Sequence, residues 1–430
     1  MFARVIWYWV QLSRNQWLPR DELEKIQLKQ LRAVVKQAYE HVPFYKRLYD
    51  RNNVHPTQLR TLDDIRRFPI LSKEFVRDIP FEERIADNVD PKRCTVKTTS
   101  GSTGIPLRVL EDPRSVDYLD AYHLRRLFEY GYRPWETIVR LTTEPPGKEV
   151  IGATGEARGG LMKTLRQSKV KRLIIAEGMD KHLQILSDCR PEFIVAPPSY
   201  LRVLEEQQTP IRPRVLMTWG EILDESTRTS LSSRFGSEVY DGYGCTEVAP
   251  IGGLAWECRK RDGLHINSDT VVLEVLKDGE PVASGERGEV VVTSLFRNAT
   301  PMIRYQLGDM VTTVAEGCPC GRAMPLIKNI DGRLVDFLQL PNGKLISPYA
   351  MIFAIQDIPG IARFRVIQET LERIVVILEK GTEFSSRTIS DIRDACMTLL
   401  GKDVNVEVQL IDAFPIEKGK FRAVASLVHY

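Results

Sequence analysis

Residues 193–221 read FIVAPPSYLRVLEEQQTPIRPRVLMTWGE, which is two short apolar runs on either side of a helix-compatible segment. Apolar runs of the same kind come earlier, TIVRL at 137–141 and RLIIA at 172–176. Short β-branched runs that alternate with helices are typical of parallel strands covered by helices. The stretch from about 135 to 245 therefore predicts an α/β fold built on a parallel sheet.

The chain beyond this stretch has a different pattern. Two hairpin-like strands, at 271–276 and 289–295, flank a turn at Asp278 and Gly279. A β-β-α-β pattern follows, with strands at 362–368 and 373–379, a helix from Ser385 or Ser386 to Gly401, and a strand at 404–411. Three strands and a helix of this length can bury an apolar core of their own and form a separate domain. We expect a large domain over 1–330, a hinge at 331–336 and a small α+β domain over 337–430.

The N-terminal fifty residues predict helix. Residues 21–50 carry helical periodicity, and the first helix is expected to end before Pro43. The preceding MFARVIWYWVQL, at 1–12, is short, contains a basic residue and lacks a cleavage site, so neither a signal peptide nor a membrane span is expected. The Trp-Tyr-Trp cluster at 7–9 predicts either a cap on the core or a homodimer contact rather than membrane binding.

Composition narrows the class of protein. The 430 residues contain 60 Lys and Arg against 57 Asp and Glu, a net charge of +3, so there is no basic excess for charge-driven binding to nucleic acid. The seven cysteines do not form a disulfide framework. We therefore expect a cytoplasmic protein that has no membrane span and does not bind nucleic acid.

The densest cluster of small residues is TTSGSTGIP, at 98–106. Its glycines tolerate positive φ and its hydroxyls surround exposed backbone N–H groups, so it can wrap the phosphates of a nucleotide. It is not a Walker A motif, because Leu107-Arg108 stands where Lys-Ser/Thr would be. Taken alone, the same composition also suits a flexible turn.

YDGYGCTE, at 240–247, offers three groups suited to ATP. The ring of Tyr243 suits a purine, the Thr246 hydroxyl suits a phosphate, and the Glu247 carboxylate can hold the Mg²⁺ that travels with ATP. The single Asp309 of RYQLGDM can accept hydrogen bonds from ribose hydroxyls. Each of these segments alone also suits a turn or a strand end.

Two further segments carry basic residues. IDGRLVDF places Arg333 and Asp336 at the expected hinge, and PIEKGKFR places Lys420 beside a glycine near the chain end. In order, the hydroxyl/glycine loop, WGE, YGCTE, Gly-Asp, Gly-Arg and Gly-Lys resemble the segments of adenylate-forming (AMP-binding) enzymes over essentially the whole chain. The closer resemblance is to phenylacetate–coenzyme A ligases, on AYEHVPFYKRLYD at 38–50, FPILSKEFVRD at 68–78, CPCGRAMP at 318–325 and the overall length.

The resemblance implies a role for each segment. Thr246 would contact the α-phosphate and Glu247 the magnesium ion, while Lys420 would bridge the substrate carboxylate and the α-phosphate. The first loop would hold the β- and γ-phosphates, and the WGE and YG segments would clamp the adenine. The nucleotide-binding set is then Ser100, Gly101, Ser102, Thr103, Gly104, Gly220, Glu221, Tyr243, Gly244, Asp309 and Arg333.

The reaction that the resemblance implies is ATP-dependent ligation of a carboxylic acid, aryl and phenylacetate-like, to coenzyme A. The carboxylate attacks the α-phosphorus, and a fixed ammonium lowers the barrier between the two anions. In relatives the small domain then rotates and the thiol intercepts the acyl adenylate. ATP, Mg²⁺, coenzyme A and the acid are the small molecules implied.

Two features depart from phenylacetate ligases proper. Val335 stands where the family has the first residue of an Asp-Asp pair, so the hinge residue is either Val335 or Asp336. LPNGKLISP, at 340–348, is longer than its counterpart and resembles relatives linked to capsule biosynthesis or to adenylation of a deazaflavin cofactor. The alternative is therefore an adenylyltransferase or ligase of the same superfamily with a different acceptor.

Four potential metal ligands are Cys258, His265, Cys318 and Cys320. Their spacing is not that of a standard zinc finger, so spacing alone also suits four unrelated residues. The resemblance implies a structural Zn²⁺ at these positions, where three thiolates and one imidazole would make a closed tetrahedral site.

Overall fold

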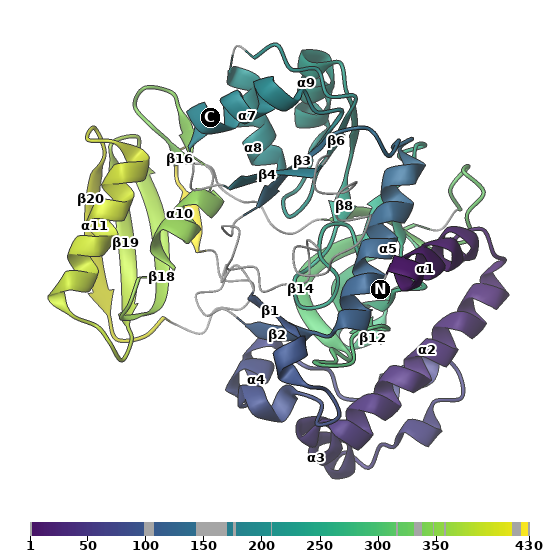
Figure 1. The fold of residues 1–430 in the computed structure, drawn as a ribbon. Coiled ribbons are helices and arrows are strands. Elements are labelled where there is room, and N and C mark those ends of the chain that lie inside the picture. The colour runs from purple at the N-terminus through teal and green to yellow at the C-terminus, as the bar shows by residue number, and fades with distance from the viewer. Residues whose placement is uncertain are drawn as a thin grey trace.

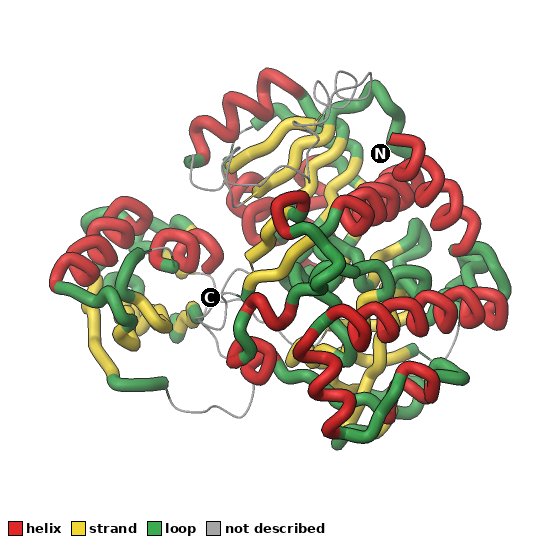
Figure 2. Tube along the Cα trace, turned by 60° about the horizontal axis from the view of Figure 1, so that its bottom comes forward, coloured by secondary structure: helices red, strands yellow, loops and turns green. Residues whose placement is uncertain are grey.

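The computed structural model describes residues 2–98, 107–142, 170–174, 178–207, 209–314, 317–330, 338–346, 348–356, 358–414 and 423–428. The described residues form a large unit up to residue 330 and a smaller C-terminal unit that lies to one side of it (Figure 1, Figure 2). Of the helices within these ranges, none is long and apolar enough to cross a lipid bilayer.

Helices and short 3-10 turns make up the N-terminal part of the large unit. The buried face of α2 repeats apolar residues every three or four positions, as the periodicity predicts, and α3 begins at Pro43, where the missing N–H costs nothing. The elements are α1 (Phe2–Asn15), α2 (Arg20–His41), α3 (Pro43–Arg51), η1 (Pro56–Gln58), η2 (Asp63–Arg67), α4 (Lys73–Asp78), η3 (Phe81–Arg84), η4 (Pro91–Arg93) and α5 (Pro113–Glu129).

A five-stranded sheet of order β4-β3-β5-β6-β7 lies at the centre of the second part, and every neighbouring pair is parallel. Leu186, Leu201 and Leu231, from three successive helices, belong to the apolar cluster on one of its faces. The predicted α/β fold is confirmed. The elements are β3 (Ile138–Thr142), β4 (Val170–Ile174), α7 (Met179–Cys189), β5 (Phe193–Val195), α8 (Pro198–Glu206), β6 (Val215–Met217), α9 (Glu225–Phe235) and β7 (Glu238–Tyr240).

An eight-stranded antiparallel sheet of order β12-β11-β13-β14-β15-β10-β9-β8 completes the large unit. β11 pairs with β13 as the hairpin pattern predicts, but the turn at Asp278 and Gly279, both with positive φ, joins β11 to the short β12 first. The strands are β8 (Gly242–Tyr243), β9 (Ala255–Glu257), β10 (Leu264–Ile266), β11 (Val271–Lys277), β12 (Glu280–Pro281), β13 (Arg287–Ser294), β14 (Tyr305–Thr313) and β15 (Leu326–Ile330); β1 (Thr95–Thr98) and β2 (Arg108–Glu111) form a separate hairpin.

The C-terminal unit is an α+β structure with its own apolar core, as the β-β-α-β pattern predicts. Its sheet has the order β20-β19-β18-β21, and its main helix is capped by Ser385 and ends at Gly401. The elements are β16 (Leu338–Gln339), β17 (Leu345–Ile346), α10 (Pro348–Ile355), β18 (Ile361–Thr370), β19 (Arg373–Lys380), α11 (Ser386–Leu400), β20 (Asn405–Ile411) and β21 (Val424–Ser426).

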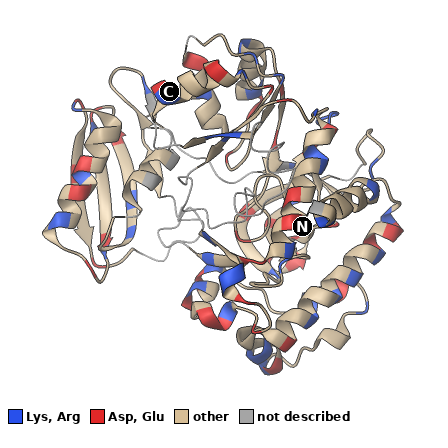
Figure 3. Ribbon diagram, in the orientation of Figure 1, with Lys and Arg blue, Asp and Glu red and all other residues tan. Residues whose placement is uncertain are grey.

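Charges of both signs alternate along the exposed helices, which is clearest on α2 (Figure 3). On that helix Lys25 pairs with Asp21 at 3.1 Å and Lys36 with Glu40 at 3.8 Å. Exposed pairs of this kind contribute little to stability. Their alternation matches the near-balanced composition.

Candidate active site

Two of the predicted nucleotide-binding residues contact each other although 66 positions separate them. The Tyr243 hydroxyl, on β8, donates to Asp309 Oδ2, on β14, at 2.8 Å, and both side chains are buried. The sheet order places three strands between β8 and β14, so the two residues are not on neighbouring strands of the ladder. The contact brings the residues predicted for adenine and ribose into one site.

Glu247, the predicted magnesium ligand, lies beside a lysine that the sequence did not single out. Lys73 Nζ, on α4, is 3.4 Å from Glu247 Oε1, and the Tyr305 hydroxyl is 3.3 Å from the same oxygen. Burial, followed by the charge of Glu247, raises the pKa of Tyr305. A cation and a hydroxyl therefore converge on the carboxylate predicted to hold Mg²⁺.

A buried arginine forms hydrogen bonds with the backbone of the turn that carries Thr246. Arg297 donates to the carbonyl of Thr246 at 3.0 Å and to that of Val248 at 2.6 Å, and pairs with Glu111 at 2.8 Å. A Cβ at Gly244 would lie 2.6 Å from the Ala249 carbonyl oxygen, so only glycine fits there without a shift of the backbone. These contacts fix the backbone of the predicted phosphate-binding turn.

The WGE segment follows β6, and its glutamate is buried with no cation beside it among the residues that the structure describes. Glu221 accepts hydrogen bonds from Ser199 N–H at 2.8 Å and Ser199 Oγ at 2.6 Å, at the start of α8. Burial raises the pKa of Glu221 to about 7, against the effect of the two hydrogen bonds. Gly220 has φ of 80° and lets the chain turn at this point.

Several predicted residues lie outside the described residues. They are Ser100, Gly101, Ser102, Thr103, Gly104, Arg333, Val335, Asp336 and Lys420. The structure describes the strands on either side of the first loop, which pair from Thr95↔Glu111 to Thr98↔Arg108. The loop therefore starts and ends on the same two-stranded ribbon.

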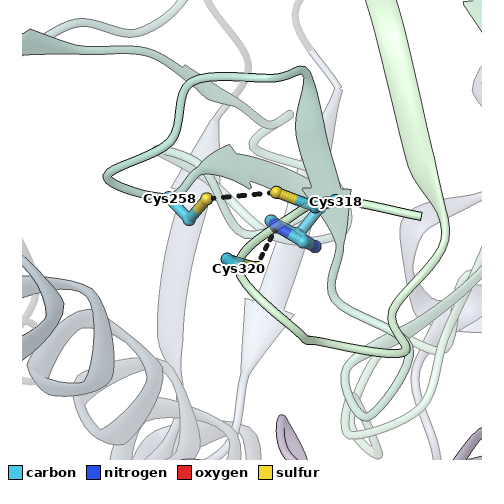
Figure 4. A group of neighbouring side chains, drawn as sticks. Cys258, Cys318 and Cys320 are labelled. Atoms are coloured by element: carbon cyan, nitrogen blue, oxygen red, sulfur yellow. Dashed lines mark hydrogen bonds between the residues drawn. The ribbon is translucent and has the colours of Figure 1, made fainter. Parts of the chain in front are cut away.

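The four potential metal ligands come together as the resemblance implies (Figure 4). Cys258 Sγ is 3.6 Å from Cys318 Sγ, Cys320 Sγ is 3.3 Å from His265 Nε2, and all four ligand atoms lie within 4.8 Å of one another. Zn–S bonds of about 2.3 Å and Zn–N bonds of about 2.0–2.1 Å require ligand separations of this size in a tetrahedral site.

Two of the four groups, His265 and Cys320, have pKa values shifted toward the form that binds a metal, and the other two do not. Burial lowers the pKa of His265 to about 4, so the imidazole is neutral and free to act as a ligand at pH 7. Burial raises the pKa of Cys258 and Cys318, whereas hydrogen bonds involving Arg322 outweigh burial and lower that of Cys320. A divalent cation would offset the cost of the buried thiolates.

Two family models match different parts of the chain. The model described as AMP-binding enzyme matches residues 171–296, which contain the YGCTE segment and the strands of the parallel sheet other than β3. The model described as CapK C-terminal domain matches residues 338–426 in the small unit.

Curated relatives include phenylacetate-coenzyme A ligases. That of Escherichia coli (strain K12) is 31% identical over 333 residues, which cover 74% of this chain and 72% of the relative. That of Thermus thermophilus is 30% identical over 334 residues, covering 75% and 72%. Protein CapK of Staphylococcus aureus is 21% identical over 424 residues, covering 93% and 88%.

Among solved structures, 2-hydroxyisobutyryl-CoA ligase in complex with 2-HIB-AMP and CoA, in the thioesterification state, aligns with a TM-score of 0.67. It is 24% identical, and the alignment covers 96% of this chain and 91% of that one. The likeness shows that the two chains share one fold.

Proposed function

We infer the activity from the family, because this chain belongs to the phenylacetate–coenzyme A ligases. It is an AMP-forming acid–thiol ligase, which joins a carboxylic acid to coenzyme A through an acyl adenylate at the expense of ATP. The observation that supports this most directly is the Tyr243–Asp309 contact, which joins groups suited to base and sugar. Glu247, the group suited to the metal, and Asp309 both act on the thiol of Cys245, which lies between Tyr243 and Glu247 in the chain.

The first step is attack of the acid carboxylate on the α-phosphorus, which releases pyrophosphate. We propose that Thr246 contacts the α-phosphate, on a turn held rigid by Arg297. No general base is needed because the nucleophile is already ionised. A rigid donor aimed at the phosphate stabilises the transition state without reorganising during the reaction.

Two charged residues complete the proposed adenylation site. Glu247 would hold Mg²⁺, which when bound neutralises charge on the departing pyrophosphate. Lys420 would place its ammonium between the carboxylate and the α-phosphate. The remaining contacts proposed for the nucleotide are Ser100, Gly101, Ser102, Thr103, Gly104, Gly220, Glu221, Gly244 and Arg333.

In the second step the sulfur of coenzyme A attacks the acyl carbon of the adenylate, the bond from that carbon to the phosphate oxygen breaks, and AMP leaves. The thiol therefore needs access to the position that Lys420 would occupy in the first step. We propose that residues 331–336 are a hinge between a domain at 1–330 and a mobile one at 337–430. The separate core of the C-terminal unit supports this, because a unit with its own core can rotate as a rigid body.

The Cys258, His265, Cys318 and Cys320 cluster is proposed to hold structural Zn²⁺. The ligands come from β10 and from two segments beside it, at the end of β9 and before β15. An ion at this point would crosslink them. Four protein ligands leave no open position for substrate, so the metal would stabilise the fold.

Cytoplasmic location and homodimerisation also belong to the proposal. Use of ATP and coenzyme A supports a cytoplasmic location, as do seven free cysteines. In the N-terminal cluster, Tyr8 packs on Tyr118 and Trp9 on Phe128, whereas Trp7 is 55% exposed. Trp7 is therefore the residue of this cluster that we propose for a homodimer contact.

ATP–pyrophosphate exchange measured across a panel of carboxylic acids, with and without coenzyme A, tests the function. An aryl, phenylacetate-like acid should support exchange, and coenzyme A should then yield a thioester and AMP. AMP release that needs another nucleophile and not coenzyme A would favour the alternative acceptor, which the match to the CapK C-terminal domain supports. The absence of acid-dependent exchange in every case would overturn the assignment.

A further inference from the structure

A fully buried arginine lies directly beneath the YDGYG segment. Arg126, on α5, is 0% exposed, and its Nη1 donates to the carbonyl of Ile251. A Cβ at Gly242 would lie 2.6 Å from Arg126 Nη2 and 3.0 Å from Gly252 Cα. The guanidinium therefore contacts two glycine peptides, and any side chain at either position would displace it.

Among the described residues Arg126 has no acidic partner, a state that it shares with Arg84 and that separates it from the other buried arginines. Arg125, its neighbour on α5, pairs with Asp269 at 2.7 Å, and Arg304 pairs with Glu274 at 2.9 Å. Among the described residues no carboxylate pairs with Arg126, and its Nε and Nη2 have no hydrogen-bond partner. Its other polar neighbours are the neutral hydroxyls of Tyr122 and Tyr130.

A buried guanidinium that has no anionic partner lowers the stability of the fold. An arginine cannot lose its proton in a protein, so it keeps its charge. A buried charge without a partner destabilises the fold, and removing one partner of a buried pair does so strongly. An anion that enters from solution would offset this cost and satisfy both open donors, since guanidinium groups bind carboxylates through two parallel hydrogen bonds.

The position of Arg126 connects it to the proposed reaction. Gly242 directly precedes Tyr243, the residue proposed for adenine, and Gly252 follows the turn that carries Thr246, the residue proposed for the α-phosphate. The acyl group is attached to the α-phosphate in the intermediate. In the proposal below, the end of the acid that is remote from the reacting carboxylate extends past Gly242 toward Arg126.

We propose that Arg126 determines acid specificity by receiving a second anionic group, so that the substrate class is a dicarboxylic acid or another acid with a remote anion. This rests on the proposed ligase function. A site built around a buried donor discriminates strongly against an analogue that leaves the donor unpaired, by about 10²-fold or more.

Matched acid pairs in the ATP–pyrophosphate exchange assay test the proposal. The pairs are 4-carboxyphenylacetate against phenylacetate and adipate against hexanoate. The wild type should prefer the dianion of at least one pair by about 10²-fold in kcat/KM. Arg126→Gln should remove most of that preference and leave the KM for ATP unchanged, while Arg126→Lys should keep part of it.

Arg125→Gln is the matched control, because it removes a buried guanidinium from the same helix that already has an acidic partner. It should lower stability and leave the selectivity ratio unchanged. Equal use of both members of each pair by the wild type would overturn the proposal even if Arg126→Gln failed to fold. An Arg126→Gln variant that loses activity equally toward both members would also overturn it. Exchange with phenylacetate or hexanoate alone, the members that lack a second anionic group, would overturn this proposal and leave the ligase assignment intact.

Discussion

Lys73 Nζ lies 3.4 Å from Glu247 Oε1, and both side chains are largely buried, at 13% and 9% exposed. Lys73 is the first residue of α4, whose N-cap Ser72 accepts a hydrogen bond from Phe75 N–H. Glu247 belongs to the YGCTE turn, in a distant part of the chain. The pair joins the N-terminal helices to the predicted magnesium ligand.

Lys73→Met should lower the free energy of unfolding by about 1–3 kcal/mol, because it leaves a mostly buried carboxylate without its cation. Denaturant unfolding of Lys73→Met, Glu247→Gln and the double variant measures the coupling. The double variant should be more stable than the sum of the single effects predicts. Lys46→Met is the control, since Lys46 pairs with Asp50 on an exposed surface. Strictly additive effects would contradict a direct interaction.

Glu221 should make stability depend on pH. Burial raises its folded-state pKa to about 7 from an ordinary value of 4.5. The folded chain therefore binds the proton more tightly, and this contribution is present below pH 4.5 and is lost as the pH rises to about 7. Glu221→Gln removes the effect, so the wild type should lose on the order of 2 kcal/mol more than the variant between pH 5 and 8.

Denaturant unfolding of both proteins at several pH values checks this. The quantity compared is the change in the free energy of unfolding with pH. Titratable groups that both proteins share contribute equally and cancel in the difference. Glu225→Gln provides a control at an exposed acidic residue at the start of α9. Parallel pH profiles for the wild type and Glu221→Gln would show that the carboxyl titrates normally.

The purified protein should contain one zinc ion per chain. Cys318→Ser should lose it and unfold at a lower temperature, because a hydroxyl is a poor zinc ligand and the remaining thiols stay buried. Cys189→Ser, at a half-buried cysteine outside the cluster, should keep the ion. Elemental analysis and thermal unfolding with and without a chelator measure both effects. Stoichiometric zinc in Cys318→Ser would exclude the proposed ligand set.

Lys420→Ala should abolish acid-dependent pyrophosphate exchange, with a fall of about 10²-fold or more, because it removes a charge that acts on the transition state. The affinity for ATP should persist, since the other nucleotide contacts remain. Exchange kinetics measure the rate of the adenylation step, and ATP titration measures the affinity for ATP. Lys418→Ala is a control at a neighbouring cation in the same segment. Undiminished exchange in Lys420→Ala would remove this lysine from the mechanism.

The sequence alone was sufficient to predict the α/β sheet, the antiparallel strands and the α+β unit, because each depends on a local period of hydrophobic residues. The helix from Ser385 to Gly401 was predicted for the same reason, since its cap and stop residues lie next to it. The order of the motifs along the chain and its resemblance to a known family, rather than geometry, identified Tyr243, Asp309 and the four metal ligands as candidates.

Contacts between distant segments were decided by tertiary structure. Nothing local to Lys73, Ser199 or Arg297 indicates that they meet Glu247, Glu221 and the Thr246 turn. The same holds for Arg126, which looks like its neighbour Arg125 in the sequence but, unlike Arg125, pairs with no carboxylate in the part of the chain that the structure describes. Whether a charge is paired depends on which chain segments pack around it, and a period along one segment carries no information about that.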